Sequence, residues 1–333
     1  MVLKDVFKRP LLDLRISVTD RCNMRCRYCM PREHFDNNHV YLPKSDILSF
    51  EEIVHVVESL IPSGLRKVRL TGGEPLIRKD LHKLIQQLRS LSSELDIALT
   101  TNAHLLSNSI ERLKEAGISR ITVSLDAVDV DVYQSMGDTT STPDMILESI
   151  DKTLAMDIPV KVNTVVQKGI NEHQIIPLIT QMSSRDVPIR FIEYMDVGAT
   201  NSWNLDHVMT GKEMRTIIEN EFGTIQMVEP DHPSDVAKEY TTNSGSIIGF
   251  IESISNPFCG DCSRARLSAN GSIFTCLFAT KGFDIRGILR MDANKKEISQ
   301  AITSIWNQRK DRYSETRSEK TDSERIEMSF IGG

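Results

Sequence analysis

Short apolar runs alternate with amphipathic stretches through about the first 200 residues of the chain. Each run is rich in Ile, Val, Leu or Thr, which is typical of strands buried on both faces of a parallel sheet. Helical patterns separate the runs. We therefore predict six strands, at Leu14–Val18, Lys67–Leu70, Asp96–Thr100, Arg120–Leu125, Val160–Val166 and Ile189–Met195.

Two helix starts can be predicted from capping residues. Ser49 and Glu52 have the spacing of a capping box, in which each side chain accepts a hydrogen bond from the other residue's backbone N–H. Ser107 is predicted to cap a later helix that Gly117 ends. The helix that follows Ser49 has apolar residues at helical spacing, at Ile53, Val56, Val57 and Leu60.

Six βα repeats without a dinucleotide-binding glycine fingerprint predict an α/β fold, an incomplete (βα)6 TIM-like barrel over residues 1–200. A closed barrel needs eight repeats, so another part of the chain must cover the open side. Residues 201–333 lose the βα rhythm and predict a smaller α+β unit. Within it we expect a helix near Gly211–Asn220, a strand pair near Lys238–Ser253 and a helix near Glu297–Asn307. The charged stretch Gln308–Arg325 is expected to be solvated and flexible.

Composition places the chain among globular proteins. Its 333 residues are 40% hydrophobic and carry a net charge of −6, which argues against nucleic-acid or membrane-surface binding. No run approaches the length of a membrane span, and the charged start Met1–Pro10 lacks the apolar core of a secretion signal. We therefore expect a cytoplasmic protein.

The six cysteines fall into two triplets, and such spacing in a cytosolic chain favours metal or redox chemistry over disulfides. Cys22, Cys26 and Cys29 have the spacing C-x3-C-x2-C directly after the first predicted strand. Three thiolates can hold three irons of a four-iron cluster and leave the fourth iron open for a ligand. A zinc site completed by His34 or His39 is the alternative.

The second triplet, Cys259, Cys262 and Cys276, also leaves one iron open, although a bare C-x2-C also occurs in zinc ribbons. Arg264 and Arg266 follow it at i and i+2, so an extended strand directs both to one side. Arginine forks match phosphate oxygens. More cations lie in predicted strands, where they need a partner such as a polyphosphate or the carboxylates of Glu193 and Asp126; these cations are Arg15, Arg69 and Lys161.

The first triplet, with Tyr28 before its last cysteine, resembles the signature of the radical S-adenosylmethionine (SAM) superfamily. Thr71-Gly-Gly-Glu-Pro75 is similar in position to the family's SAM-amino-group motif, although alone it would be an ordinary turn. The resemblance implies that SAM chelates the open iron of a [4Fe-4S] cluster on Cys22, Cys26 and Cys29. It also implies SAM contacts from the Tyr28 backbone, Gly73, Ser124 and Met195, of which Met195 could equally be a core residue.

Both triplets, the arginine pair and the Gly-Gly end together resemble the GTP 3′,8-cyclase family of molybdenum-cofactor biosynthesis, from about Leu11 to Gly333. That resemblance implies a second [4Fe-4S] cluster, on Cys259, Cys262 and Cys276, whose open iron binds guanine. The C-terminal Gly332 and Gly333 would assist catalysis. Ala103 departs from the glycine expected there. The implied GTP contacts are Arg15, Arg69, Thr100, Lys161, Arg264 and Arg266.

The same resemblance implies a lyase reaction. Reductive SAM cleavage gives a 5′-deoxyadenosyl radical that takes H3′ of GTP. The C3′ radical then attacks guanine C8 to form (8S)-3′,8-cyclo-7,8-dihydroguanosine 5′-triphosphate. The implied partners are GTP, an electron donor of unknown identity, the cyclic pyranopterin monophosphate synthase that receives the product, and a second copy in a homodimer.

Other interpretations of these motifs make different predictions. A peptide-modifying radical SAM enzyme usually has more cysteines in its C-terminal part than the three found here. A zinc-stabilised GTP-binding module would be colourless, whereas iron–sulfur clusters would make the protein brown. The Gly-Gly end could also be a frayed terminus, or a ubiquitin-like end on a much smaller fold.

Overall fold

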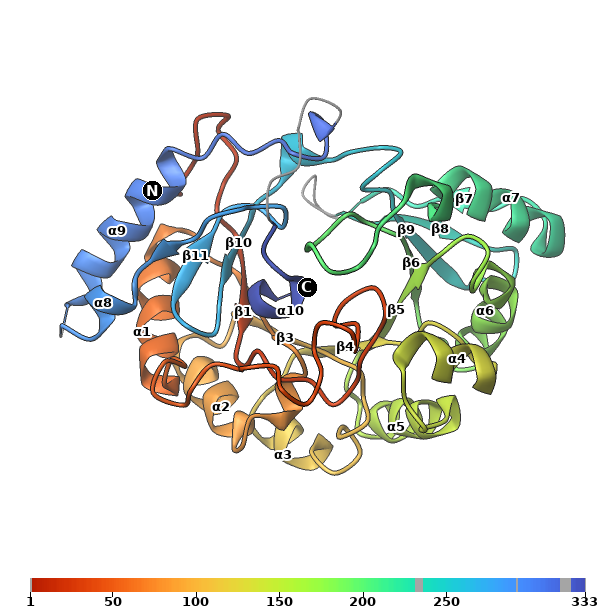
Figure 1. The fold of residues 1–333 in the computed structure, drawn as a ribbon, viewed down its shortest axis with the longest axis horizontal. Coiled ribbons are helices and arrows are strands. Elements are labelled where there is room, and N and C mark those ends of the chain that lie inside the picture. The colour runs from red at the N-terminus through yellow and green to blue at the C-terminus, as the bar shows by residue number, and fades with distance from the viewer. Residues whose placement is uncertain (1, 231–235, 292, 318–324, 333) are drawn as a thin grey trace.

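The computed structural model describes residues 2–230, 236–291, 293–317 and 325–332 (Figure 1). Over the first part of the chain, strands and helices alternate and confirm the six predicted strands within two residues at each end. These elements are β1 (Asp13–Ser17), α1 (Phe50–Leu60), β2 (Lys67–Thr71), α2 (Leu81–Leu91), β3 (Asp96–Thr101), α3 (Ile110–Glu115), β4 (Arg120–Ser124), α4 (Val130–Gly137), α5 (Pro143–Ala155), β5 (Val160–Val166), α6 (Ile175–Ser183) and β6 (Ile189–Glu193).

The later part of the chain mixes short strands and helices and confirms the predicted helices and strand pair. The turn η5 (Cys259–Asp261) holds part of the second cysteine triplet. The elements are α7 (Gly211–Phe222), β7 (Gln226–Met227), β8 (Lys238–Thr241), β9 (Ile247–Ile251), β10 (Arg264–Leu267), β11 (Ser272–Phe274), β12 (Phe283–Asp284), α8 (Arg286–Leu289), α9 (Lys295–Asn307) and α10 (Met328–Ile331).

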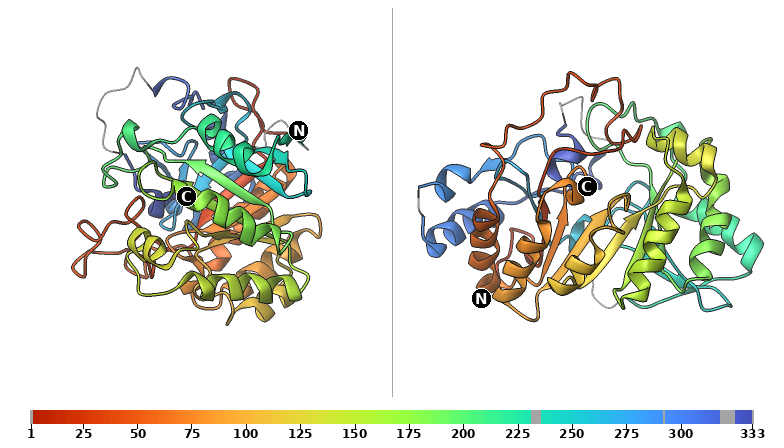
Figure 2. Two further views of the ribbon diagram at one scale, coloured as in Figure 1. Left: turned by 90° about the vertical axis from the view of Figure 1, so that its right-hand side faces the viewer. Right: turned by 90° about the horizontal axis from the view of Figure 1, so that it is seen from below.

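One curved sheet connects both parts of the chain, in the order β12-β11-β10-β1-β2-β3-β4-β5-β6-β9-β8-β7. β10 pairs in parallel with β1, and β9 pairs in parallel with β6, so the C-terminal region extends the predicted six-stranded barrel at both edges. Helices cover the outside of the curve, while α10 lies inside it next to β1 (Figures 1 and 2). The boundary at residue 200 stays a prediction, since the sheet itself is continuous across it.

Local signals explain where α1 begins. The Ser49 hydroxyl accepts a hydrogen bond from the Glu52 N–H at 3.1 Å, and the Glu52 carboxylate accepts one from the Ser49 N–H at 2.6 Å. The predicted Ser107 cap is wrong, because α3 starts later and the Ser107 hydroxyl instead lies 2.8 Å from that of Ser149. Gly117 does follow the end of α3, with a positive φ of 87°.

The outer face of the sheet forms the core of the molecule. Alternate residues of β1 and β2, such as Leu14 and Val68, are fully buried under the helices. The residues between them face the inside of the curve and are polar, which differs from the apolar filling of a closed barrel. None of the helices in the described part of the chain has the length and apolar composition that crossing a bilayer requires.

Candidate active site

Three arginines form a row across the inside of the sheet. In the strand register, Arg15 on β1 is the direct neighbour of Arg266 on β10 and of Arg69 on β2. Arg264 lies two residues before Arg266 and is level with Asp13. The sequence predicted each of these cations as a phosphate ligand, and the tertiary structure brings them together.

Asp13 is a counter-charge to this row and raises the pKa of all three arginines, but burial outweighs it. Burial, and then repulsion from Arg266 and Arg264, lowers the pKa of Arg15 well below its usual value. Burial likewise lowers the pKa of both Arg69 and Arg266 to about 10. The buried Nε atoms of Arg15 and Arg69 have no hydrogen-bond partner in the described residues. Crowded, desolvated arginines with open donors are suited to a multivalent anion.

Glu193 and Asp126, the alternative partners for these cations, are engaged elsewhere. The buried Glu193 carboxylate accepts hydrogen bonds from the backbone N–H groups of Gly211 and Ile254, at 2.8 Å each. Asp126 accepts hydrogen bonds from the Tyr28 hydroxyl at 2.7 Å and the Val165 N–H at 2.8 Å. Neither carboxylate therefore neutralises the arginine row.

The other predicted GTP contacts lie on neighbouring strands. Thr100 on β3 accepts a hydrogen bond from Arg69 Nη1 at 3.0 Å, which orients that guanidinium. Lys161 Nζ on β5 lies 3.2 Å from a Glu239 carboxylate oxygen, which Arg190 Nη2 on β6 also contacts at 2.7 Å. Our sequence analysis missed Arg190, although a cation within a predicted strand was the same signal that identified Lys161.

The first cysteine triplet lies in the loop directly after β1, at the carboxyl end of the parallel strands. Burial, followed by the neighbouring thiols Cys22 and Cys29, raises the pKa of Cys26 well above its usual value. Burial also raises the pKa of Cys22 to about 11. Three neighbouring, partly buried thiols with raised pKa values need strong positive charge to ionise, and a bound iron centre would supply that charge. A cleft of about 320 Å³ opens beside Cys22, lined also by Arg25 and Asp138.

The Gly-Gly motif after β2 brings its backbone against this cysteine loop. The Gly73 N–H donates to the Thr19 carbonyl at 2.8 Å, and a Cβ at Gly73 would lie 2.2 Å from the Arg21 carbonyl oxygen. The buried Glu74 carboxylate, whose pKa burial raises to about 7, accepts the Asn102 N–H at 2.8 Å. The motif therefore fixes the loop that carries Cys22.

We expect Gly73→Ala to lower the free energy of unfolding by about 1–3 kcal/mol, because the new Cβ overlaps a backbone carbonyl that cannot rotate away. Urea denaturation of the cluster-free chain measures this. Gly287→Ala is the matched control, since nothing lies within 4 Å of a Cβ at Gly287. Equal stability of the two variants would contradict the close approach.

The second triplet lies at the opposite end of β1. Cys262 comes two residues before Arg264, whose strand neighbour Asp13 begins β1. Burial opposes ionisation of Cys262, but Arg264 and Arg309 outweigh it and lower the pKa of this thiol to about 6. Burial raises the pKa of Cys276 to about 11. All six cysteines are free thiols.

Each triplet supplies three thiolates, the ligand number that leaves one iron of a four-iron cluster open. Within the described ranges, no group of three or more His, Cys, Asp or Glu side chains is arranged to hold a single metal ion. A four-iron cluster takes one thiolate per iron, so its ligands lie farther apart than those of one ion. The His39 ring packs between Phe35 and Tyr41, with centroid distances of 4.6 Å to each.

The C-terminal segment enters the curve of the sheet. The Gly332 carbonyl accepts a hydrogen bond from Arg266 Nη1, and Ile331 is fully buried. Met195 packs near Cys276 and Met328 in a small apolar cluster, so the structure places this predicted SAM contact beside the tail. Gly333 lies outside the described residues. Ser124 is level with Asn163 on the inner side of β4.

The prediction that Gln308–Arg325 is solvated is wrong for several described residues. Arg309 and Tyr313 are buried, at 4% and 6% exposure. The buried Asp196 carboxylate accepts hydrogen bonds from the Tyr313 hydroxyl at 2.6 Å, Arg317 Nε at 3.1 Å and Arg325 Nη1 at 2.8 Å. A charged stretch of sequence predicts solvent exposure. Here, however, the distant Asp196 carboxylate binds two arginines of this stretch, Arg317 and Arg325.

Ala103, where the resemblance predicts glycine, adopts a positive φ of 64° and is fully buried. Glycine reaches this backbone region without the steric cost that a Cβ imposes. The Ala103 N–H donates to the Thr101 hydroxyl at 3.0 Å, which holds the turn. The substitution therefore preserves the turn geometry and touches none of the cysteines.

Comparisons with known proteins agree with this geometry. The family model for the Radical SAM superfamily matches residues 16–182, and that for Molybdenum Cofactor Synthesis C matches residues 187–315. In the solved structures, SuiB of Streptococcus suis bound to S-adenosylmethionine has a TM-score of 0.64 at 15% identity, over 95% of this chain and 69% of that chain, which shows a shared fold.

Curated relatives are similar over their whole length. The GTP 3′,8-cyclase of Staphylococcus haemolyticus is 44% identical over 99% of both chains, and that of Staphylococcus saprophyticus is equally similar. The GTP 3′,8-cyclase of Staphylococcus carnosus is 43% identical over the same share. Full-length similarity, both family matches, and two cysteine triplets at opposite ends of β1 with an arginine row between them place this chain in the GTP 3′,8-cyclase family of the radical SAM superfamily.

Proposed function

We propose that this chain joins C3′ of the GTP ribose to C8 of its guanine, with SAM and two [4Fe-4S] clusters as cofactors, in the first step of molybdenum-cofactor biosynthesis. One observation carries the proposal. The two cysteine triplets lie at opposite ends of β1, and the row Arg266–Arg15–Arg69 lies between them. The five residues of β1 span about 13 Å, a distance that a nucleoside triphosphate can bridge.

When bound, the first cluster and SAM would supply the 5′-deoxyadenosyl radical, and the second cluster would supply an open iron for guanine. Cys22, Cys26 and Cys29 would hold the first cluster, while Cys259, Cys262 and Cys276 would hold the second. Within the first site, the Tyr28 backbone, Gly73, Ser124 and Met195 would contact SAM.

Residues on the polar inner face of the sheet would bind and position GTP. Arg15, Arg69, Lys161, Arg264 and Arg266 would bind the phosphate oxygens, and Thr100 would keep the Arg69 guanidinium oriented. This positioning keeps the ribose C3′ directed towards the first triplet and the base towards the second. C3′ and C8 belong to the same GTP molecule, and holding the ribose and the base in one conformation removes the entropic cost of bringing these two carbons together. The tail that ends in Gly332 and Gly333 would exclude water from the radical, since Ile331 and Gly332 are buried.

Partners beyond GTP are part of the same proposal. An external one-electron donor, of a class that the residues do not specify, would reduce the first cluster. The product would pass to the cyclic pyranopterin monophosphate synthase. We also propose a homodimer in the cytoplasm.

Iron and sulfide analysis of anaerobically purified protein tests the proposed cofactors directly. We expect a brown protein with about eight iron and eight sulfide per chain, as two four-iron clusters require. Colourless protein with tightly bound zinc would overturn the proposal in favour of a GTP-binding module. Incubation with GTP, SAM and dithionite should then give the cyclised nucleotide.

We expect Arg266→Ala to weaken GTP binding by roughly tenfold or more, through loss of a charge-assisted hydrogen bond. The iron content should not change. Calorimetric titration of the protein with GTP alone, under conditions in which no reaction occurs, measures the affinity. Arg185→Ala is the control, since this residue pairs with Asp151 on the outer helices at 2.7 Å. Unchanged GTP affinity in Arg266→Ala would make the arginine row structural.

A further inference from the structure

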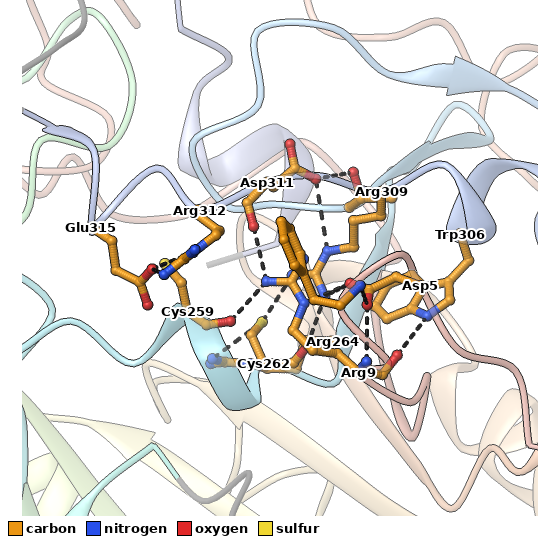
Figure 3. A network of polar contacts seen from close by, with 12 residues as sticks. Asp5, Arg9, Cys259, Cys262, Arg264, Trp306, Arg309, Asp311, Arg312 and Glu315 are labelled. Atoms are coloured by element: carbon orange, nitrogen blue, oxygen red, sulfur yellow. Dashed lines mark hydrogen bonds and ion pairs between the residues drawn. The ribbon is translucent and has the colours of Figure 1, made fainter.

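Three charged side chains are buried behind the turn of the second triplet (Figure 3). Asp5 and Arg9 precede β1, and Arg309 follows α9; their side chains are 0%, 2% and 2% exposed. Arg9 Nε lies 2.5 Å from Asp5 Oδ2, and Arg309 Nη1 lies 3.5 Å from the same oxygen. Two guanidinium groups share the one buried carboxylate of this Asp5 cluster, formed by Asp5, Arg9 and Arg309, and the further carboxylate near Arg309, that of Asp311, is partly exposed to solvent, so the buried charges leave one positive charge in excess.

The excess charge is directed at the cysteine turn. Arg9 Nη1 donates to the Cys259 carbonyl at 2.7 Å, and Arg309 Nη1 donates to the Cys262 carbonyl at 2.7 Å. The second nitrogen of Arg309, Nη2, donates to Cys262 Sγ at 3.2 Å, closer than Arg264 Nη2 at 3.7 Å. Arg309 Nε also lies 3.7 Å from a carboxylate oxygen of the partly exposed Asp311. Figure 3 shows Arg309 between Asp311, Asp5 and Cys262.

The first triplet has different surroundings. Among the described residues, Cys22 Sγ accepts hydrogen bonds from the neutral Asn102 amide at 3.8 Å and from the Met24 backbone N–H at 3.5 Å. The carboxylates of Glu74 and Asp126 are both buried close enough to interact with cysteines of this triplet. Buried carboxylates thus lie near the first triplet, together with Arg25, whereas arginine N–H groups donate directly to a sulfur of the second triplet, near which Asp311 also lies.

We propose that Arg309 is a positioning residue that raises the reduction potential of the second cluster. This inference rests on the proposed function, because it requires a four-iron cluster on the second triplet. Reduction adds one negative charge to a cluster, and N–H donors to its thiolate sulfurs together with a buried cation stabilise that added charge. Arg309 supplies both, through a contact to Cys262 Sγ that is shorter than that of Arg264.

The test uses the full chain in a background with Cys22, Cys26 and Cys29 all replaced by Ala, so that signals come from the second cluster alone. In this background we compare Arg309→Gln, Arg309→Lys and the control Arg312→Gln. Arg312 lies three residues further on, is half exposed and pairs with Glu315, so it loses the same charge without a sulfur contact. Iron and sulfide counts, and an anaerobic redox titration followed by electron paramagnetic resonance, are the measurements.

We expect the same iron count in all variants. Arg309→Gln should lower the equilibrium constant for one-electron reduction at least tenfold, which corresponds to about 59 mV. Arg309→Lys keeps the charge but loses the several N–H donors of the guanidinium group, so it should shift the reduction potential less. Arg312→Gln should not shift it. An unchanged potential in Arg309→Gln would overturn the proposal. Loss of the cluster in both Arg309 variants, with retention in the control, would overturn it by making Arg309 structural. A background without iron would overturn the proposed function itself.

Discussion

Cys26→Ala should abolish the cleavage of SAM to 5′-deoxyadenosine. Cys26 is the middle ligand of the first triplet, and its buried thiol interacts with both Cys22 and Cys29. Two remaining thiolates leave two irons without a protein ligand, so the cluster that reduces SAM would be lost. Chromatographic measurement of 5′-deoxyadenosine after addition of SAM and dithionite checks this under anaerobic conditions.

Cys276→Ala is the matched control for this experiment, because it removes one thiol from the second triplet at the other end of β1. We expect it to retain SAM cleavage and to lose formation of the cyclised nucleotide. Continued production of 5′-deoxyadenosine by Cys26→Ala would contradict the assignment of the first triplet. Loss of SAM cleavage in both variants would show that the two sites are not independent.

Deletion of Gly332 and Gly333 should stop formation of the cyclised nucleotide while both clusters remain. The Gly332 carbonyl is bound by Arg266, and a Cβ at Gly332 would lie 2.5 Å from Thr71 Cγ2, so the chain end fits closely between β10 and β2. Without these residues Arg266 keeps its donors for phosphate, and GTP binding should stay nearly intact. Some SAM cleavage should continue without transfer to GTP.

Three measurements on the truncated protein test this together: iron content, GTP affinity by calorimetry, and the ratio of cyclised nucleotide to 5′-deoxyadenosine. Gly332→Ala is an intermediate variant, since its positive φ of 74° and the contact with Thr71 both oppose a side chain. We expect it to lower the same ratio less than the deletion does. Product at the full rate from the truncated protein would remove any catalytic role for the tail.

The sequence by itself determined the repeating elements and the cysteine chemistry. Apolar strand patterns and the Ser49 capping box depend on neighbours within a few residues, and the structure places those strands and that helix as predicted. The spacing of each triplet is equally local. Arg15, Arg69 and Lys161 could be identified because a cation in a buried strand needs an anionic partner.

Only the tertiary structure decided how these parts meet. β10 inserts beside β1 although about 250 residues separate them in the chain, and no local pattern specifies a parallel pairing of that separation. That pairing alone makes Arg266 the neighbour of Arg15 and puts the second triplet at the far end of the same strand. Arg309 looked solvated because a charged stretch carries no sign of the distant Asp5 and Cys262 that bury it. Short motifs therefore identify the chemically active residues of this site. Their arrangement depends on long-range strand pairing and on the compensation of buried charges.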